Sequence, residues 1–173
     1  ASPTRVGTIT NWIFGLFCAL TGLSIAFQFQ SDHATRLSPL APVLFVAFVV
    51  LWVVRQRVRS ASRRRLVALA IAAVGIGLAS SVDGLGALPT IFLTTLVVAL
   101  DVSVVAAFAV DLILVLVEVV IMRTVYGQTT ISALVQGLGM LLFATFGLGF
   151  AWIIREFSDQ QEQLAAANAE LAH

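Results

Sequence analysis

The sequence predicts an all-α membrane protein with six transmembrane helices, and its composition is the first reason. Of its 173 residues, 60% are hydrophobic and 11% are charged, and the mean hydropathy is +1.02. A chain this apolar cannot cover a water-soluble domain with polar side chains. Its apolar residues form runs close to the roughly 20 residues that a helix needs to cross the bilayer. These runs lack the alternating pattern of a membrane β-barrel, so helices are the expected elements.

The distribution of arginine sets the expected orientation. Six of the ten basic residues lie in the segment 55–65. Carrying arginine through the hydrocarbon core is costly, so this segment is expected to stay on the cytoplasmic side. With six crossings, Arg5 and Arg155 also lie inside, and only Arg36 and Arg123 lie outside. Both termini are therefore expected in the cytoplasm.

Polar or turn-forming segments separate the predicted helices. The first external segment is 28–38, and a second external turn is expected at 83–86. The basic segment is expected to form a cytoplasmic loop, and 123–130 the last external loop. The expected helices span about residues 10–29, 39–54, 66–82, 87–100, 104–122 and 131–154.

The stretch 88–122 is almost unbroken apolar sequence, and its interpretation as one or two helices remains open. As one helix it would measure roughly 50 Å at 1.5 Å per residue, which exceeds the hydrocarbon thickness. Two helices joined by a cytoplasmic turn fit the membrane and keep more arginines inside. Asp101 is then expected at this turn, where it or Ser103 caps the second helix.

The last helix is expected to continue beyond the membrane, because neither Gly nor Pro interrupts the polar sequence that follows it. Phe157, Leu164 and Leu171 recur every seven residues. Asn168 falls at the heptad position where a buried Asn favours a parallel dimer. The run covers fewer than three heptads, so a solvated amphipathic helix is the alternative. The expected division of the chain is a transmembrane domain, 1–154, and a cytoplasmic coiled-coil linker, 155–173.

The C-terminal tail follows a multi-helix membrane block and Arg155-Glu156-Phe157, and it reads Gln163-Leu164-Ala165-Ala166-Ala167-Asn168-Ala169-Glu170-Leu171-Ala172-His173. This tail resembles the linker of bacterial sensor histidine kinases. The resemblance implies a homodimeric sensor in a bacterial plasma membrane. It also implies a kinase domain downstream in the same polypeptide, which acts on a response regulator. The chain has no phosphoacceptor signature and no glycine-rich ATP-binding motif, so these residues are not expected to form an enzyme.

Asp111 and Glu118 are the main candidates for an intramembrane sensing site. They lie seven residues apart and share one face of the fifth helix. A carboxyl group near the bilayer centre costs roughly 3 kcal/mol on insertion scales, so both are expected to point into the bundle. A proton- or ligand-sensitive site and plain interhelical hydrogen bonding by neutral acids remain alternative roles. The expected partners are polar side chains of other helices, namely Gln136, Thr94, Thr95 and Thr145.

Glycines in the sixth helix are expected to let it pack closely or bend. Gly147 and Gly149 lie in the part that leads to Phe157 and the linker. A change in helix packing is therefore expected to pass directly into the dimer linker. Replacing either glycine with Leu is expected to lock the signalling output in one state.

The alternative function is a small-solute binding or transport subunit.

Other chemistries find little support in the sequence. Cys18 is the only cysteine, so no disulfide and no cysteine-based metal cluster forms within one chain. The hydrolase motifs G-x-S-x-G and H-E-x-x-H are absent from the sequence. We expect no metal, no cofactor and no nucleic-acid partner. The expected partners are the lipid bilayer and a second copy of the chain.

Overall fold

The computed structural model describes residues 5–30, 38–82 and 87–171, and these residues are helical apart from short turns. The all-α prediction is confirmed. Of the expected external segment 28–38, residues 28–30 belong to the first helix and 38 to a short 3-10 helix, and residues 31–37 lie outside the described residues, as does the expected turn at 83–86. In chain order the elements are α1 (Arg5–Gln30), the short 3-10 helix η1 (Ser38–Leu40), α2 (Ala41–Arg57), α3 (Ala61–Ser81), α4 (Ala87–Asp101), α5 (Val104–Thr124) and α6 (Thr130–Leu171).

The stretch 88–122 forms two helices, α4 and α5, rather than one. Ser103 caps α5, because its backbone is extended and its Oγ accepts a hydrogen bond from the amide of Ala106 at 3.0 Å. The interpretation of Asp101 as a cap is wrong. Asp101 is the last residue of α4, and its carboxylate pairs with Arg55 of α2 instead.

The basic segment is mostly helical, which corrects the expected loop. α2 continues to Arg57 and α3 begins at Ala61, so only 58–60 connects them. Arginine has a high helix propensity, and its long side chain reaches water from a helix end as well as from a loop. Most of these arginines therefore project from the last turn of α2 or the first turns of α3.

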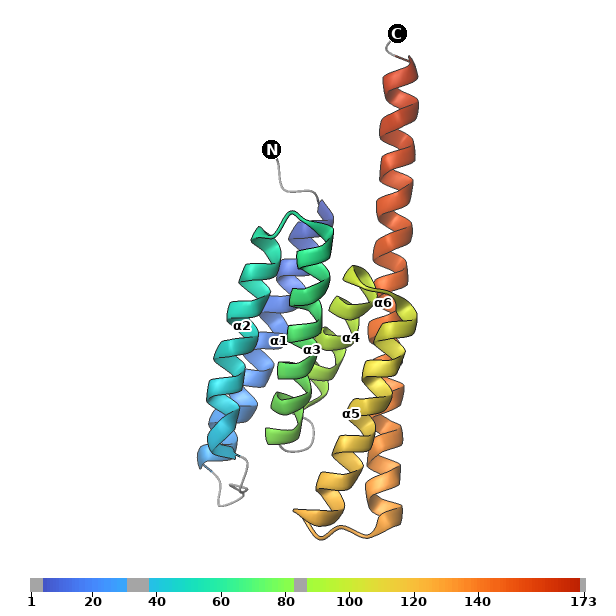
Figure 1. Ribbon diagram of the computed structural model, residues 1–173. Helices are drawn as coiled ribbons and strands as arrows, with labels where there is room; N and C mark the ends of the chain where they lie inside the picture. The colour runs from blue at the N-terminus through green and yellow to red at the C-terminus, as the bar shows by residue number, and fades with distance from the viewer. Residues whose placement is uncertain (1–4, 31–37, 83–86, 172–173) are drawn as a thin grey trace.

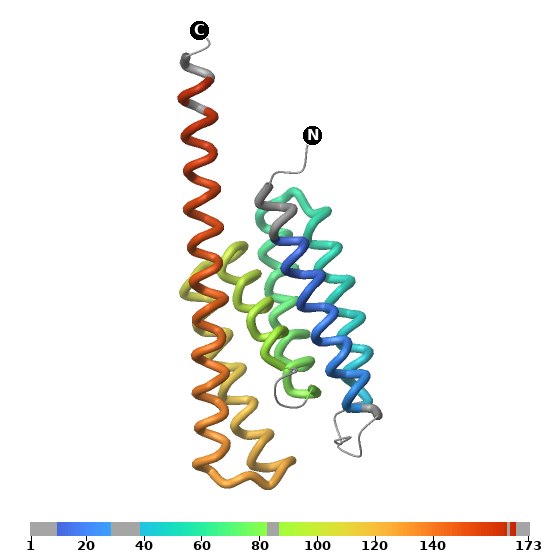
Figure 2. Tube along the Cα trace, turned by 180° about the vertical axis from the view of Figure 1, so that it is seen from behind, coloured from blue at the N-terminus to red at the C-terminus, as the bar shows by residue number. Residues whose placement is uncertain are grey.

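α4 is the central helix of the bundle. Apolar residues surround its axis, and such a helix is stable when neighbours cover it on all sides. It contacts α1, α3, α5 and α6. Figures 1 and 2 show α4 between the group α1–α3 and the hairpin of α5 and α6. Its buried residues are Ala87 and every residue from Pro89 to Ala99.

α6 is a single helix of 42 residues, about 63 Å long at 1.5 Å per residue. It packs beside α4 and α5 and then extends beyond the bundle, at the end where α1 begins (Figures 1 and 2). Its buried face is built largely from small residues, which let neighbouring backbones approach closely. The buried positions are Ala133, Gly137, Met140, Ala144, Gly147 and Ala151.

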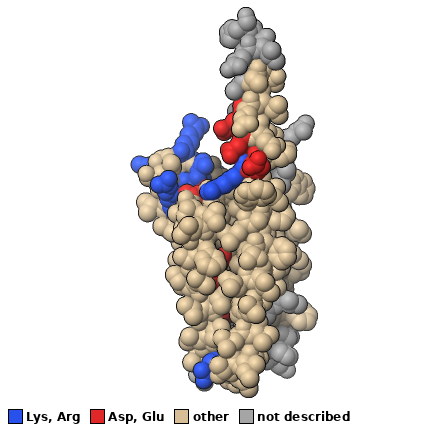
Figure 3. All heavy atoms as spheres, turned by 90° about the vertical axis from the view of Figure 1, so that its right-hand side faces the viewer, with Lys and Arg blue, Asp and Glu red and all other residues tan. Residues whose placement is uncertain are grey.

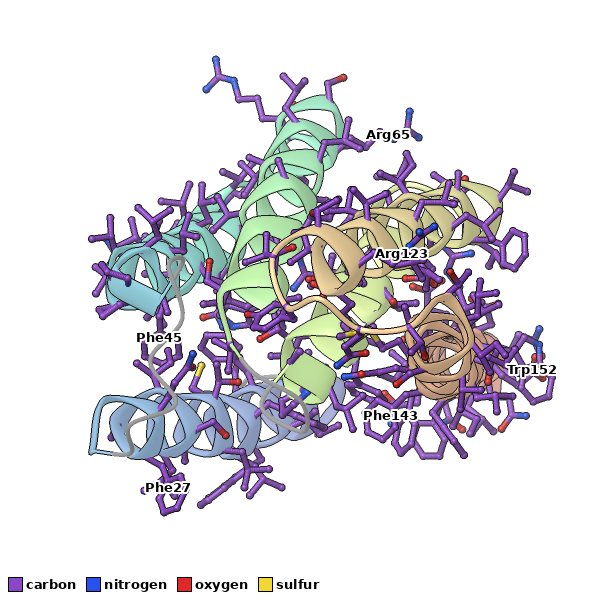
Figure 4. All side chains as sticks on the ribbon, turned by 90° about the horizontal axis from the view of Figure 1, so that it is seen from below. Phe27, Phe45, Arg65, Arg123, Phe143 and Trp152 are labelled. Carbon is purple, nitrogen blue, oxygen red and sulfur yellow. The ribbon has the colours of Figure 1, made fainter. Side chains whose placement is uncertain are left out.

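The outer surface is apolar along most of the bundle, as expected for lipid contact. Phe27 and Trp152 are 72% and 66% exposed, and both project away from the helices, whereas Phe45 lies between α1 and α2 (Figure 4). Basic side chains gather at one end of the molecule, with acidic side chains on the adjacent part of α6 (Figure 3). Below them lies a broad band without basic side chains, in which acidic atoms show only in recesses.

Within the described residues, four helices are long and apolar enough to cross a membrane, namely α1, α3, α5 and α6. α4 is equally apolar but has 15 residues, about 22 Å at 1.5 Å per residue. α2 has 17 residues, about 26 Å on the same basis. These lengths and compositions identify a helical membrane protein.

Candidate functional site

Asp111 is buried at the contact between α5 and α4, with 1% of its surface exposed. Its Oδ1 is hydrogen-bonded to the hydroxyl of Thr95, one of the partners expected from the sequence. The same hydroxyl lies 2.9 Å from the backbone oxygen of Ile91, one turn earlier in α4. Among the described residues, no hydrogen-bond partner reaches Asp111 Oδ2.

Glu118 is buried about two turns further along α5 and is 3% exposed. Its carboxyl group is hydrogen-bonded with the side chain of Ser80 on α3. The Ser80 hydroxyl also donates to the backbone oxygen of Ile76 at 2.8 Å. Glu118 Oε1 has no partner in the described part of the chain. Each acid therefore meets one hydroxyl from another helix and keeps one buried oxygen without a partner.

The other polar candidates stay apart from the two acids. Gln136 is half-buried on α6, and no hydrogen bond joins it to either acid within the described ranges. Thr145 is exposed and donates to the backbone oxygen of Leu142 at 2.5 Å. Thr94 is buried against Gly75 of α3, with no hydrogen bond to its Oγ1 from any described residue.

A second polar cluster lies at the last turn of α4. Arg55 of α2 forms an ion pair with Asp101, in which Nη2 donates to Oδ1 at 3.0 Å and Nε donates to Oδ2. The two side chains are 13% and 5% exposed. The guanidinium carbon lies 5.2 Å from the ring centre of Trp52, which stacks on Phe14 of α1 at 4.1 Å. This cluster ties α1, α2 and α4 together.

Arg155 holds the same end of α4 from the opposite side. Its Nη2 donates to the backbone oxygens of Ala99 and Leu100, the latter at 3.2 Å. The last carbonyls of a helix lack partners within the helix, and a cation there also interacts favourably with the helix dipole. We call Arg55 and Arg155 the arginine clamp. The sequence did not predict this role of Arg155, because nothing in its neighbourhood reveals a partner more than 50 residues away.

Replacing Arg155 with Gln is expected to loosen α6 from the end of α4. A hydrogen bond from a charged group contributes about 1.5–3 kcal/mol, so we expect the free energy of unfolding in detergent to fall by about 2 kcal/mol. Thermal unfolding followed by circular dichroism measures this change. The control is Arg123→Gln, which alters an exposed arginine at the far end of α5 and should cost less than about 0.5 kcal/mol. Equal losses in the two variants would show that Arg155 does not hold α6.

The two glycines singled out in α6 occupy different faces of the helix. A β-carbon at Gly147 would lie 3.0 Å from the backbone oxygen of Phe92 and 3.1 Å from Thr95 Cβ. A β-carbon at Gly149 would meet no described atom within 4 Å. Gly147 is therefore the position where α6 rests directly on α4, beside the threonine that contacts Asp111.

The linker candidates lie on the part of α6 that projects past the bundle. Phe157 and Leu164 are 50% and 64% exposed, and Asn168 is also exposed. Leu171 is the last residue of α6, and its side chain lies outside the described set. Exposed apolar side chains on a helix surrounded by water need a partner or cost free energy.

An apolar crevice lies between α1, α2, α3 and α4. It has no room for a water-sized molecule, whereas ordinary ligand pockets measure roughly 300–1,000 Å³. Its lining residues are Phe17, Cys18, Thr21, Phe45, Phe48, Leu78, Thr90 and Leu93.

No family model matches the chain, and neither a curated protein nor a solved structure matches it. The function therefore has to be argued from the two buried acids, the arginine clamp and α6.

Proposed function

We propose that this chain is the membrane sensor and signal-transmission module of a bacterial two-component histidine kinase. In this proposal a stimulus within the membrane changes how α6 packs, and α6 carries the change to a cytoplasmic coiled coil. The observation that carries the proposal is the continuity of α6 from Thr130 to Leu171. One continuous helix contacts α4 at Gly147, contributes Arg155 to the arginine clamp and then leaves the bundle, so a shift at one end reaches the other.

The proposed topology has six crossings, with both termini on the cytoplasmic side of the plasma membrane. The arginines of α2 and α3 lie at the end where α1 begins and where α6 leaves the bundle (Figure 3). This placement follows the positive-inside rule. α2 and α4 are short for independent spans, but α4 is enclosed by protein and needs no direct match to the lipid thickness.

The proposed output is a parallel homodimer formed by the extension of α6. Phe157 and Leu164 present apolar surface in a region rich in Gln, Glu and Asp, which is the pattern of a dimer seam. Asn168 then favours two parallel strands in one register. The proposed partners are the second copy, a kinase domain further along the same polypeptide and, through it, a response regulator.

Disulfide crosslinking in native membranes tests this proposal. In a chain where Cys18 is replaced with Ser, a single cysteine at Leu164 is expected to crosslink efficiently between copies, and one at Leu171 likewise. The matched control is a cysteine at Gln163, which is exposed but lies off the predicted seam. We expect several-fold less crosslinking there.

Equal crosslinking at Leu164 and Gln163, or a monomeric chain with none, would contradict the proposed dimer. The alternative of a small-solute binding or transport subunit would then be the one to test, by measuring saturable uptake in vesicles.

A further inference from the structure

We infer that Asp111 is an intramembrane proton-binding site and that Thr95 couples the proton to the position of α6. Its role in signalling rests on the proposed function, whereas the proton site and its link to α6 rest on the contacts alone. The ligand class is the proton, and the two partners are one carboxyl and one hydroxyl on facing helices.

Both side-chain hydrogen bonds of Thr95 form at the same time only when Asp111 carries a proton. The Thr95 hydroxyl has one hydrogen, yet its oxygen contacts two oxygens, Ile91 O at 2.9 Å and Asp111 Oδ1. Both contacts are satisfied when the Asp111 carboxyl group donates to Thr95 and Thr95 donates to Ile91. If Asp111 is ionised, Thr95 can satisfy only one of the two acceptors.

Among the residues that the structure describes, no cation pairs with Asp111 to balance its charge when it is ionised. α4 carries no ionisable residue before Asp101, which Arg55 already neutralises. Between 66 and 82 on α3, and between 130 and 154 on α6, the sequence contains no ionisable residue. On α5 itself the other ionisable groups are Glu118, which is also acidic, and Arg123 at the far end. A buried charge without a partner is so costly that the group takes up a proton instead.

Thr95 connects this proton to α6. Its Cβ and Cγ2 lie 3.1 and 3.2 Å from the place that a β-carbon would occupy at Gly147. The Thr95 side chain is therefore part of the surface of α4 against which α6 packs. An anion at Asp111 draws the Thr95 hydroxyl proton away from Ile91 and needs water or further donors. The contact between α4 and α5 then has to open, and Thr95 moves with it.

Glu118 provides a matched control within the same helix. Its carboxyl group also meets a hydroxyl, that of Ser80, which bonds to the backbone one turn earlier. Ser80 belongs to α3, and the described contacts of α6 glycines include neither Ser80 nor Glu118. Glu118 is therefore a buried acid in similar surroundings whose hydroxyl partner does not contact α6 at Gly147.

Infrared spectroscopy and a distance measurement on the full chain in lipid nanodiscs test the inference. Raising the pH is expected to remove a protonated-carboxyl C=O band that Asp111→Asn lacks and Glu118→Gln retains. In the Cys18→Ser background, spin labels at the exposed positions Ser62 and Gln160 report the distance between α3 and the extension of α6. That distance is expected to shift over the same pH range in the wild type and in Glu118→Gln. It should stay fixed in Asp111→Asn.

Thr95→Val keeps the shape of the side chain and removes the hydroxyl, so it should abolish the distance shift while a carboxyl band remains. The inference is overturned if Asp111→Asn retains the titrating band, or if its label distance still follows pH as in the wild type. A titrating band and distance shift without crosslinks at Leu164 would leave the proton site in place and contradict the signalling function.

Discussion

Asp101→Asn is expected to lower the free energy of unfolding by about 3 kcal/mol, because removing one partner of a buried ion pair strands the other charge. The stranded charge is Arg55, whose side chain is 13% exposed and lies against Trp52. Asn has nearly the size of Asp, so the loss reports charge rather than packing. Reversible unfolding in mixed detergent micelles, followed by circular dichroism, measures it.

Arg57→Gln is the matched control, because Arg57 lies in the same last turn of α2 but is exposed. It should change the stability by less than about 0.5 kcal/mol. A double-mutant cycle with Arg55→Gln and Asp101→Asn should show a coupling energy of at least about 1 kcal/mol. If Asp101→Asn costs no more than Arg57→Gln, the ion pair does not fix the end of α4.

Most of the helices were predictable because polar or turn-forming segments separate the apolar runs. The division of 88–122 into two helices followed from its length, since one helix of roughly 50 Å does not fit the bilayer, and from the distribution of arginines. The turn was also placed correctly, because Ser103 is a good helix cap. The basic segment was mistaken for a loop because positive charge marks the membrane boundary without marking where a helix stops.

The partners of the charged residues were not predictable. Arg55 and Asp101 are separated by 46 residues, and the Arg155 contacts with α4 span more than 50. Spacing identifies neighbours within one helix, but it carries no information on which helices meet. Local reasoning therefore assigned Asp101 to the nearest helix end, whereas the folded chain brings it to an arginine on another helix.

The burial of the two acids was predicted correctly, because a carboxyl group in an apolar helix is costly when it faces lipid and therefore points into the bundle. Asp111 and Glu118 are both buried on one face of α5, as their spacing of seven residues indicated. The identity of the hydroxyl partner could not be predicted. Thr94 and Thr95 are adjacent in sequence, yet only Thr95 contacts Asp111, because adjacent residues point about 100° apart around a helix.

Gly147→Ala and Gly149→Ala are expected to change the stability in opposite directions. In a helix, Ala is more favourable than Gly by roughly 0.5–1 kcal/mol, and a methyl group at Gly149 meets open space. At Gly147 the methyl group would lie 3.0 Å from the backbone oxygen of Phe92, which cannot rotate away. Overpacking of this kind costs about 1–3 kcal/mol, which exceeds the gain in helix propensity.

The same two substitutions distinguish two ways in which α6 could transmit a signal, by its packing against α4 or by bending. If α6 acts by bending, both substitutions stiffen it and both should reduce crosslinking at Leu164. If it acts by resting on α4, only Gly147→Ala should change that crosslinking, together with the unfolding free energy. Gly147→Leu would displace α6 further, whereas Gly149→Leu adds an apolar side chain to a surface that already faces outward. The contact of Gly147 with Phe92 and Thr95 favours movement by packing against α4 rather than by bending. A contact so close that one added methyl group disrupts it is also sensitive to small movements of α4.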